Sequence, residues 1–216
     1  CEFANDLLVA GFDVEVFDIA SQPLGRLVPP ECGEWIRRRV AVKWHFNASV
    51  TRFENGRVHL EDGTAYPADL LLSAVGLRPR TKLAADAGIE CGRGIRVNDF
   101  LETSAAGVYA IGDCMEFEGL VLPFVMPIMH ASKALASNVL GKQMRLAFPA
   151  MPVVVKTPLA PTVVSPPKPG SSGAWHSEAG DEGVKSLFRG EDGKLLGFCL
   201  CGSAVSEKNS LAKILE

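Results

Sequence analysis

Two aspartates stand directly after apolar runs, and both could bind the hydroxyl groups of a nucleotide. Asp18 follows the alternating run FDVEVF, and Asp113 follows Gly112 and the apolar residues 107–111. Ligands of open α/β sheets bind at the carboxyl ends of strands, where an acidic side chain accepts hydrogen bonds from ribose hydroxyls. Gly112 would let a cofactor approach the backbone. Asp113 would accept hydrogen bonds from sugar hydroxyls or contact a pyrophosphate through a bridging water. The alternative for each aspartate is a solvated side chain at a strand end.

The cysteines show no spacing that would bind a metal ion. None of the six forms a CxxC pair, so we expect neither a zinc ribbon nor a dithiol redox centre. Cys199 and Cys201 would share one face of a strand, too close for a comfortable disulfide. We interpret them as reduced thiols of a cytoplasmic protein. The four histidines have no ligand spacing either, and we predict no metal site and identify no catalytic residue.

Helices and strands alternate along the part of the chain that would position the aspartates. Apolar residues recur at helical spacing in EFANDLLVA before Gly11, and a strand should follow. A helix that leads into such a strand normally follows an earlier strand, so we expect the chain to begin just after one and its turn. The other expected strands cover residues 42–46, 49–53, 57–60, 64–66, 70–72, 107–111, 184–189 and 194–200. The other expected helices cover residues 30–40, 81–87, 128–140 and the segment after Ser206, with Glu207 in its first turn.

Local signals fix several details of these elements. Asn55-Gly56 and Asp62-Gly63 predict hairpin turns, and residues 70–72, three leucines in a row, are typical of a fully buried parallel strand. Pro127 would open the longest helix. Seven of the 14 prolines fall in residues 149–169, which we interpret as a link to a small last domain.

Composition excludes two classes of partner. The chain of 216 residues has a net charge of −3 and no basic block, so we expect no nucleic-acid binding. The longest apolar run, residues 120–129, contains two prolines and is shorter than the roughly 18 residues of a membrane span. We therefore predict no membrane span.

Several strings resemble the FAD- and NAD-dependent pyridine nucleotide oxidoreductases. They are TSAAGVYAIGD at residues 103–113, LLLSAVGLRPRTKLAADAGI at residues 70–89, and DVEVFD followed by LGRLVPP. The resemblance implies an α/β fold with Rossmann-like dinucleotide-binding sheets, a truncated FAD/NAD-binding three-layer fold, and a small α+β C-terminal domain. Residues 1–76 would be an NAD-binding domain without its first strand and Gly-rich loop, and residues 77–148 the C-terminal segment of the FAD-binding domain. The N-terminal FAD-binding half would be missing.

The last half of the chain is similar to the rubredoxin–NAD reductases. The resemblance rests on GDCMEFEGLVLPFVMPIMHASKALASNVLGK, MPVVVKTPLAPTVVSPP and GFCLCGSAVSEKNSLAKILE, although FCLCG has thiols where smaller or hydroxyl residues are expected. Residues 149–216 would form a rubredoxin-binding-type domain. By this resemblance Asp113 would bind the ribityl-side hydroxyls of FAD, Val125 would approach the flavin, Lys156 would reach the isoalloxazine and Glu2 would point toward the flavin–nicotinamide region. Asp18, Gly76 and Gly112 complete the cofactor-binding candidates.

The implied activity is electron transfer from NADH through FAD to rubredoxin or a similar small iron–thiolate carrier. A flavin is needed because nicotinamide gives two electrons at once and a one-iron centre accepts one. No arginine follows Asp18, which favours NAD over NADP because a 2′-phosphate requires a cation. Rubredoxins are acidic as a family, so Lys156, Lys208 and Lys213 are candidates for a basic docking face. The alternatives are a related NAD(P)H-dependent ferredoxin or oxygenase reductase, an NADH oxidase, or a non-catalytic truncated relic.

Overall fold

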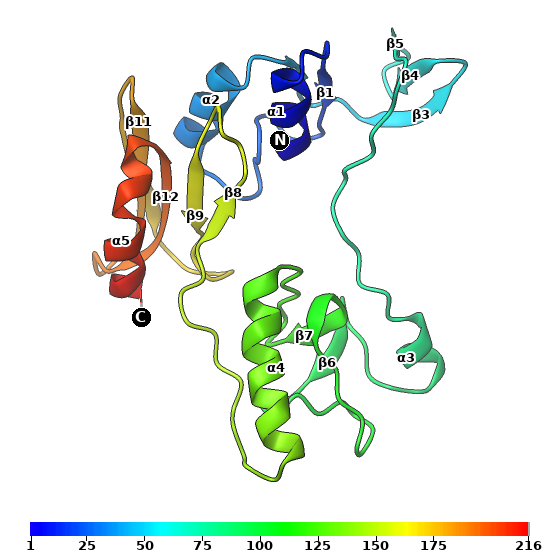
Figure 1. The fold of residues 1–216 in the computed structure, drawn as a ribbon, viewed down its shortest axis with the longest axis vertical. Helices are drawn as coiled ribbons and strands as arrows, with labels where there is room; N and C mark the ends of the chain where they lie inside the picture. Colours follow the sequence, from blue (N-terminus) through cyan, green and yellow to red (C-terminus); the bar gives the residue numbers. More distant parts are fainter. Residues whose placement is uncertain (216) are drawn as a thin grey trace. The chain divides into compact units, whose positions relative to one another are not determined.

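The computed structural model describes residues 1–215, which form two compact units (Figure 1). The outer unit combines Cys1–Leu72 with Ala150–Glu216, and the middle unit is Ser73–Pro149. Each unit is described by itself below. Glu216 lies outside the described residues. The division into three domains at residues 76 and 148 stays a prediction.

The first elements of the outer unit are those expected from the sequence. Helix α1 (Glu2–Val9) precedes strand β1 (Glu15–Phe17), and helix α2 (Pro30–Arg39) precedes strand β2 (Lys43–His45). β1 and β2 pair in parallel, as strands joined by a crossover helix do. On α2, Trp35 and Ile36 are buried while the three consecutive arginines of the last turn are exposed.

An antiparallel meander follows, again as expected. It consists of β3 (Val50–Glu54), β4 (Arg57–Leu60) and β5 (Ala65–Pro67). Asn55 and Gly56 connect the first two strands with φ of 52° and 68°. A two-residue turn with positive φ at both positions matches the twist of the flanking strands, and asparagine and glycine tolerate that conformation.

A five-stranded antiparallel sheet forms the rest of the outer unit, in the order β10-β11-β12-β9-β8. Its strands are β8 (Val153–Val155), β9 (Thr162–Ser165), β10 (Ala174–Ala179), β11 (Gly183–Arg189) and β12 (Leu195–Gly202). The interpretation of residues 149–169 as a link is wrong, because β8 and β9 lie inside this segment. Its prolines flank the two strands without interrupting them, so the ladder keeps its donors. After β12 come the 3₁₀ helix η2 (Ser203–Glu207) and helix α5 (Lys208–Leu215), so Glu207 precedes α5 and is not in its first turn.

Helices from opposite ends of the chain cover the two faces of this sheet. α2 packs on one face, where Cys32 and Ile36 join a core with Cys199 and Cys201. α5 packs on the other face, where Leu211 joins a core with residues of the same strand, Phe198 and Leu200. Side chains alternate between the faces of a strand, so Cys199 and Cys201 share a face as expected. The small α+β domain is confirmed, but one of its covering helices comes from the N-terminal part of the chain.

The middle unit has a short parallel strand pair packed against a long helix. Its elements are α3 (Lys82–Asp86), β6 (Ile95–Val97), the 3₁₀ helix η1 (Gly112–Cys114), β7 (Met115–Phe117) and α4 (Val125–Val139). β6 pairs in parallel with β7, and Met115, Phe117, Ala131 and Ala134 are buried together. α4 begins at Val125, earlier than expected, so Pro127 lies inside its first turn. That position costs no hydrogen bond, because the first N–H groups of a helix have no partner within it.

Two expected strands are absent from the described residues. Leu70, Leu71 and Leu72 are extended but unpaired, and Leu70 is 82% exposed. Residues 107–111 form a single bridge, between Tyr109 and Glu102. A parallel strand is buried only where neighbouring strands and helices cover it, and no strand of residues 1–215 pairs with residues 70–72. In this range no helix has both the length and the apolar character needed to cross a membrane.

Candidate functional site

Two polar side chains of α1 hold the loop that follows β8. The Glu2 carboxylate accepts the backbone N–H of Lys156 at 2.7 Å, and the Asn5 side-chain oxygen accepts the N–H of Leu159 at 3.0 Å. Asn5 is 1% exposed, so its hydrogen bonds are shielded from water. The structure therefore brings together two of the predicted site residues, Glu2 and Lys156, which are 154 positions apart in the sequence.

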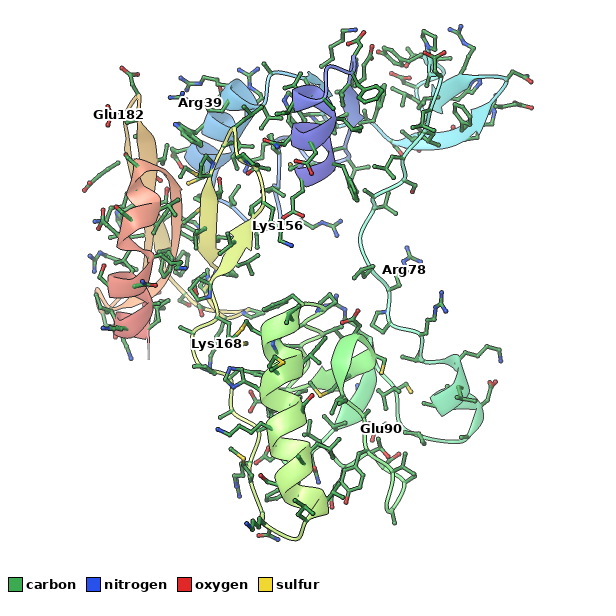
Figure 2. The ribbon with its side chains drawn as sticks, viewed as in Figure 1. Arg39, Arg78, Glu90, Lys156, Lys168 and Glu182 are labelled. Atoms are coloured by element: carbon green, nitrogen blue, oxygen red, sulfur yellow. The ribbon has the colours of Figure 1, made fainter. Side chains whose placement is uncertain are left out.

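The Lys156 side chain is left available by this arrangement (Figure 2). Glu2 contacts its backbone, while the lysine side chain is exposed and its ammonium makes no ion pair within residues 1–215. Thr157 next to it is buried and donates its hydroxyl to the Ala160 carbonyl at 2.6 Å, which fixes the loop. A cation on a fixed backbone can be presented to an external partner at little further cost in backbone entropy.

Asp18 lies at the carboxyl end of β1, beside the end of β2. Its backbone N–H donates to the His45 carbonyl at 3.0 Å, and its carboxylate accepts the N–H of Ala20 at 2.9 Å. The side chain is half-buried. One carboxylate oxygen thus orders the turn, and the position is the one at which α/β sheets bind ligands.

An aromatic cluster beside the parallel pair was not predicted from the sequence. His45 stacks on Phe17 with ring centroids 4.4 Å apart, and Tyr66 of β5 packs against both rings. The His45 Nε2 atom lies 2.9 Å from the Glu15 carboxylate, and this hydrogen bond is the main cause that lowers the pKa of Glu15. A hollow of about 560 Å³ lies next to the cluster. It is lined by residues 44–49, 60–62 and 66, none of them among the predicted site residues.

The other predicted residues belong to the middle unit. Gly112 has a φ of +81° and opens η1, which lies against α4. Asp113 follows it with an exposed carboxylate that makes no hydrogen bond to residues 1–215. Val125, the first residue of α4, is 70% exposed, and Gly76 lies in an exposed extended segment. A carbon added at Gly112 would meet no atom of residues 1–215 within 4 Å, so this part of the structure leaves the backbone open to a ligand.

A buried carboxylate close to Asp113 has a structural role. The Glu116 side chain, 9% exposed, accepts the N–H of Gly94 at 2.8 Å, and its other oxygen lies 3.6 Å from Arg96 Nε. The hydrogen bond from Gly94 is the largest cause that lowers the pKa of Glu116. Asp113 and Glu116, three positions apart, therefore differ in whether their carboxylates are bonded within the fold. Glu116 is used within the fold, whereas the lone pairs of Asp113 are not used by residues 1–215 and can accept hydrogen bonds from a ligand.

The parallel pairs with their helices, the meander and the five-stranded antiparallel sheet define an α/β protein of the dinucleotide-binding type. The chain belongs to the pyridine nucleotide-disulphide oxidoreductase family, whose pattern it matches over residues 1–137. Residues 145–215 match the rubredoxin binding C-terminal domain.

Individual relatives agree with this assignment. Rubredoxin-NAD(+) reductase of Alcanivorax borkumensis is 44% identical over the whole chain, and that of Acinetobacter baylyi is 38% identical. The chain spans 58% and 57% of their lengths. Among solved structures, NADH:rubredoxin oxidoreductase from Clostridium acetobutylicum has a TM-score of 0.74 at 22% identity, covering 98% of this chain and 54% of that one. The covalent putidaredoxin reductase–putidaredoxin complex has a TM-score of 0.86 at 22% identity, with 98% and 54% covered. These two likenesses show the fold.

Proposed function

We propose that the chain is part of a flavoprotein that passes electrons from NADH, through FAD, to rubredoxin or a similar small iron–thiolate carrier. The main support for the proposal is that one chain contains both an oxidoreductase region and a rubredoxin-binding region. An oxidoreductase region covers residues 1–137, and a rubredoxin-binding region covers residues 145–215. A reductase whose acceptor was a small molecule would have no need of a rubredoxin-binding region.

The contact between α1 and the loop at Lys156 supports the same function. Glu2 and Asn5 of the oxidoreductase region hold the backbone of residues 156–159, which belong to the rubredoxin-binding region. The backbone of Lys156 is thereby fixed where the two regions meet, and its exposed ammonium, which forms no ion pair within residues 1–215, can contact an anionic group. A positive charge near a flavin stabilises its anionic reduced form.

The residues present can hold parts of both cofactors. Asp113 would accept hydrogen bonds from ribityl hydroxyls of FAD, with Gly112 and Val125 leaving room for the cofactor, and Gly76 would leave its backbone open in the same way. Asp18 would accept from the adenosine ribose of NADH. Bound FAD supplies the conversion of a two-electron donor into one-electron steps. All six cysteines are free thiols, which supports a location in the cytoplasm.

A chimaera tests the function. The part of the Alcanivorax borkumensis relative that precedes its match to this chain, placed before this chain, should give a protein that binds FAD and reduces rubredoxin with NADH at a higher kcat/KM than with NADPH. The chain alone, which contains no G-x-G-x-x-G sequence, should leave gel filtration without stoichiometric flavin. A chimaera that binds FAD and oxidises NADH, yet transfers electrons to rubredoxin no faster than to oxygen, would contradict the proposal and favour an NADH oxidase.

A further inference from the structure

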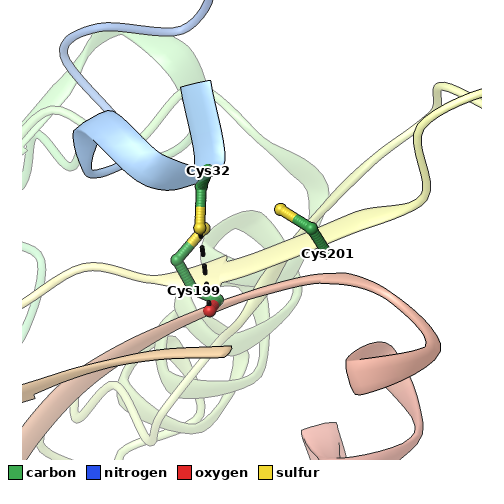
Figure 3. A group of neighbouring side chains, drawn as sticks. All are labelled: Cys32, Cys199 and Cys201. Carbon is green, nitrogen blue, oxygen red and sulfur yellow. Dashed lines mark hydrogen bonds between the residues drawn. The ribbon is translucent and has the colours of Figure 1, made fainter. Parts of the chain in front are cut away.

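We propose that Cys32, Cys199 and Cys201 form a binding site for a soft metal ion, Cu(I), coordinated by three thiolates. The three sulfur atoms all lie within 4.8 Å of one another, and all three residues are buried (Figure 3). Cys32 comes from α2, and the other two come from the face of β12 that α2 covers. This site is independent of the flavin and nicotinamide chemistry proposed above.

The spacing of the sulfurs suits three-coordinate binding. A metal ion with bonds of about 2.3 Å to three sulfurs in one plane holds them about 4 Å apart. Sulfurs that already lie within 4.8 Å of one another can reach that spacing by small side-chain rotations. Cys199 and Cys201 are fixed by the β12 ladder, opposite Ser186 and Val184 of β11 and opposite Val164 and Thr162 of β9. The backbone therefore presents the group before any ion binds.

The donor set selects the kind of ion. The group contains three thiols and neither a histidine nor a carboxylate, and soft thiolate ligands favour Cu(I) over hard cations. Two buried hydroxyls lie at its edge. The Ser186 Oγ is 3.4 Å from the Cys32 sulfur, and the Thr162 Oγ1 is 3.7 Å from the Cys201 sulfur. The Ser186 hydroxyl can donate to a Cys32 thiolate and stabilise its charge, whereas the Thr162 hydroxyl also lies 2.9 Å from the Ala160 carbonyl, which competes for its proton.

Binding of the ion replaces the protons of the three thiols. On binding, three S–H bonds break, three S–Cu bonds form, three protons go to solvent and copper stays Cu(I). The ion would join α2 to β12, elements whose cysteines are 167 positions apart. Such a link stabilises the folded outer unit by mass action.

Cu(I) itself is the probe that tests the site. The chain is titrated anaerobically with Cu(I) in competition with a chromophoric Cu(I) chelator, and the complex is examined by copper X-ray absorption. We expect one tightly bound copper per chain, three sulfur neighbours, and a Tm that rises with bound copper. In Cys32→Ala the affinity should fall by more than the roughly 10–100-fold that loss of an outer-shell partner costs. The matched control Cys1→Ala/Cys91→Ala/Cys114→Ala, which removes the cysteines outside the group, should bind like the parent.

Three results would overturn the proposal. They are a folded parent chain that does not compete with the chelator, a control triple variant that loses as much affinity as Cys32→Ala, and a copper spectrum of the parent with fewer than three sulfurs. The last measurement needs no variant, so it decides the matter even if Cys32→Ala fails to fold.

Discussion

Individual carboxylates in this chain are distinguished by what their oxygens already do. The Glu116 carboxylate accepts a hydrogen bond from Gly94 and forms an ion pair with Arg96. The Asp18 carboxylate accepts one hydrogen bond within its own turn, and the Asp113 carboxylate accepts none from residues 1–215. A carboxylate with all lone pairs used inside the fold affects stability, whereas one with free lone pairs affects binding. The sequence could not separate Glu116 from Asp113, because both are acids near the same strand and only the fold decides which one is buried.

Glu116→Gln should destabilise the middle unit by about 1 kcal/mol at neutral pH, because a neutral amide oxygen accepts the Gly94 N–H more weakly than a carboxylate does and does not attract Arg96. The pKa of Glu116 is lowered by folding. Its contribution is therefore complete above the ordinary carboxyl pKa and is lost as the pH falls through the lower, folded value. Hydrogen exchange of the β7 amides should show this loss of protection, and the exposed neighbour Glu118→Gln serves as the control. A difference between the two variants that persists below the folded pKa would contradict the role of the charge.

Asp113→Ala in the chimaera should weaken FAD binding by about 1.5–3 kcal/mol, roughly 10–100-fold, through loss of a hydrogen bond to a charged acceptor. The fold should survive because the side chain is exposed. Flavin absorbance remaining after dialysis measures the effect, with Glu118→Ala as the exposed acidic control. Equal flavin retention by parent and variant would remove Asp113 from the binding site.

Among the helices, strands and turns, the sequence predicts those that depend on neighbouring residues of the chain. It does not predict strand pairing or burial that depends on distant segments. The Asn55-Gly56 turn follows from two residues alone, and α1 and α2 follow from their own apolar spacing. Residues 70–72 are apolar enough for a buried strand, but burial depends on neighbours that their composition cannot specify. β10 was missed, and its exposed alternating residues carry little apolar signal. The contacts of Glu2 with residue 156 and of Cys32 with residue 199 join segments more than 150 positions apart, beyond any local pattern.

Asn5→Ala should destabilise the outer unit by about 1 kcal/mol, because it leaves the partly buried Leu159 N–H without its acceptor. Urea unfolding followed by tryptophan fluorescence reports this unit specifically, since Trp35, Trp44 and Trp175 all lie in it. Asn209→Ala, an exposed asparagine of α5, is the control and should stay within about 0.5 kcal/mol. Equal unfolding midpoints for the two variants would mean that α1 does not anchor the loop.

At the scale of the whole molecule, the rubredoxin-binding region cannot be removed cleanly. Deleting the residues after Pro169 would take away β10, β11, β12 and α5, and would expose the buried face of α2 that packs on Cys199 and Cys201. Loss of rubredoxin reduction in such a truncation would then report unfolding as much as docking. Substitution of surface charges is a better test than truncation. It changes the electrostatic attraction between the reductase and an acidic carrier and leaves the core in place.

The lysines whose charge reversal best tests the docking of a carrier are Lys208 and Lys213 of α5. Neither forms an ion pair in the described part of the chain, whereas Lys185 is paired with Glu207 at 2.5 Å. If an acidic carrier docks here, Lys208→Glu/Lys213→Glu in the chimaera should slow rubredoxin reduction about 10-fold at low salt, and added salt should narrow the difference from the parent. Reduction of a small dye should not change, since it requires no docking. Lys194→Glu, in the turn before β12 beside Asp192, is the charge-matched control and should have a smaller effect. If dye and rubredoxin reduction fall together, α5 supports folding and the carrier docks elsewhere.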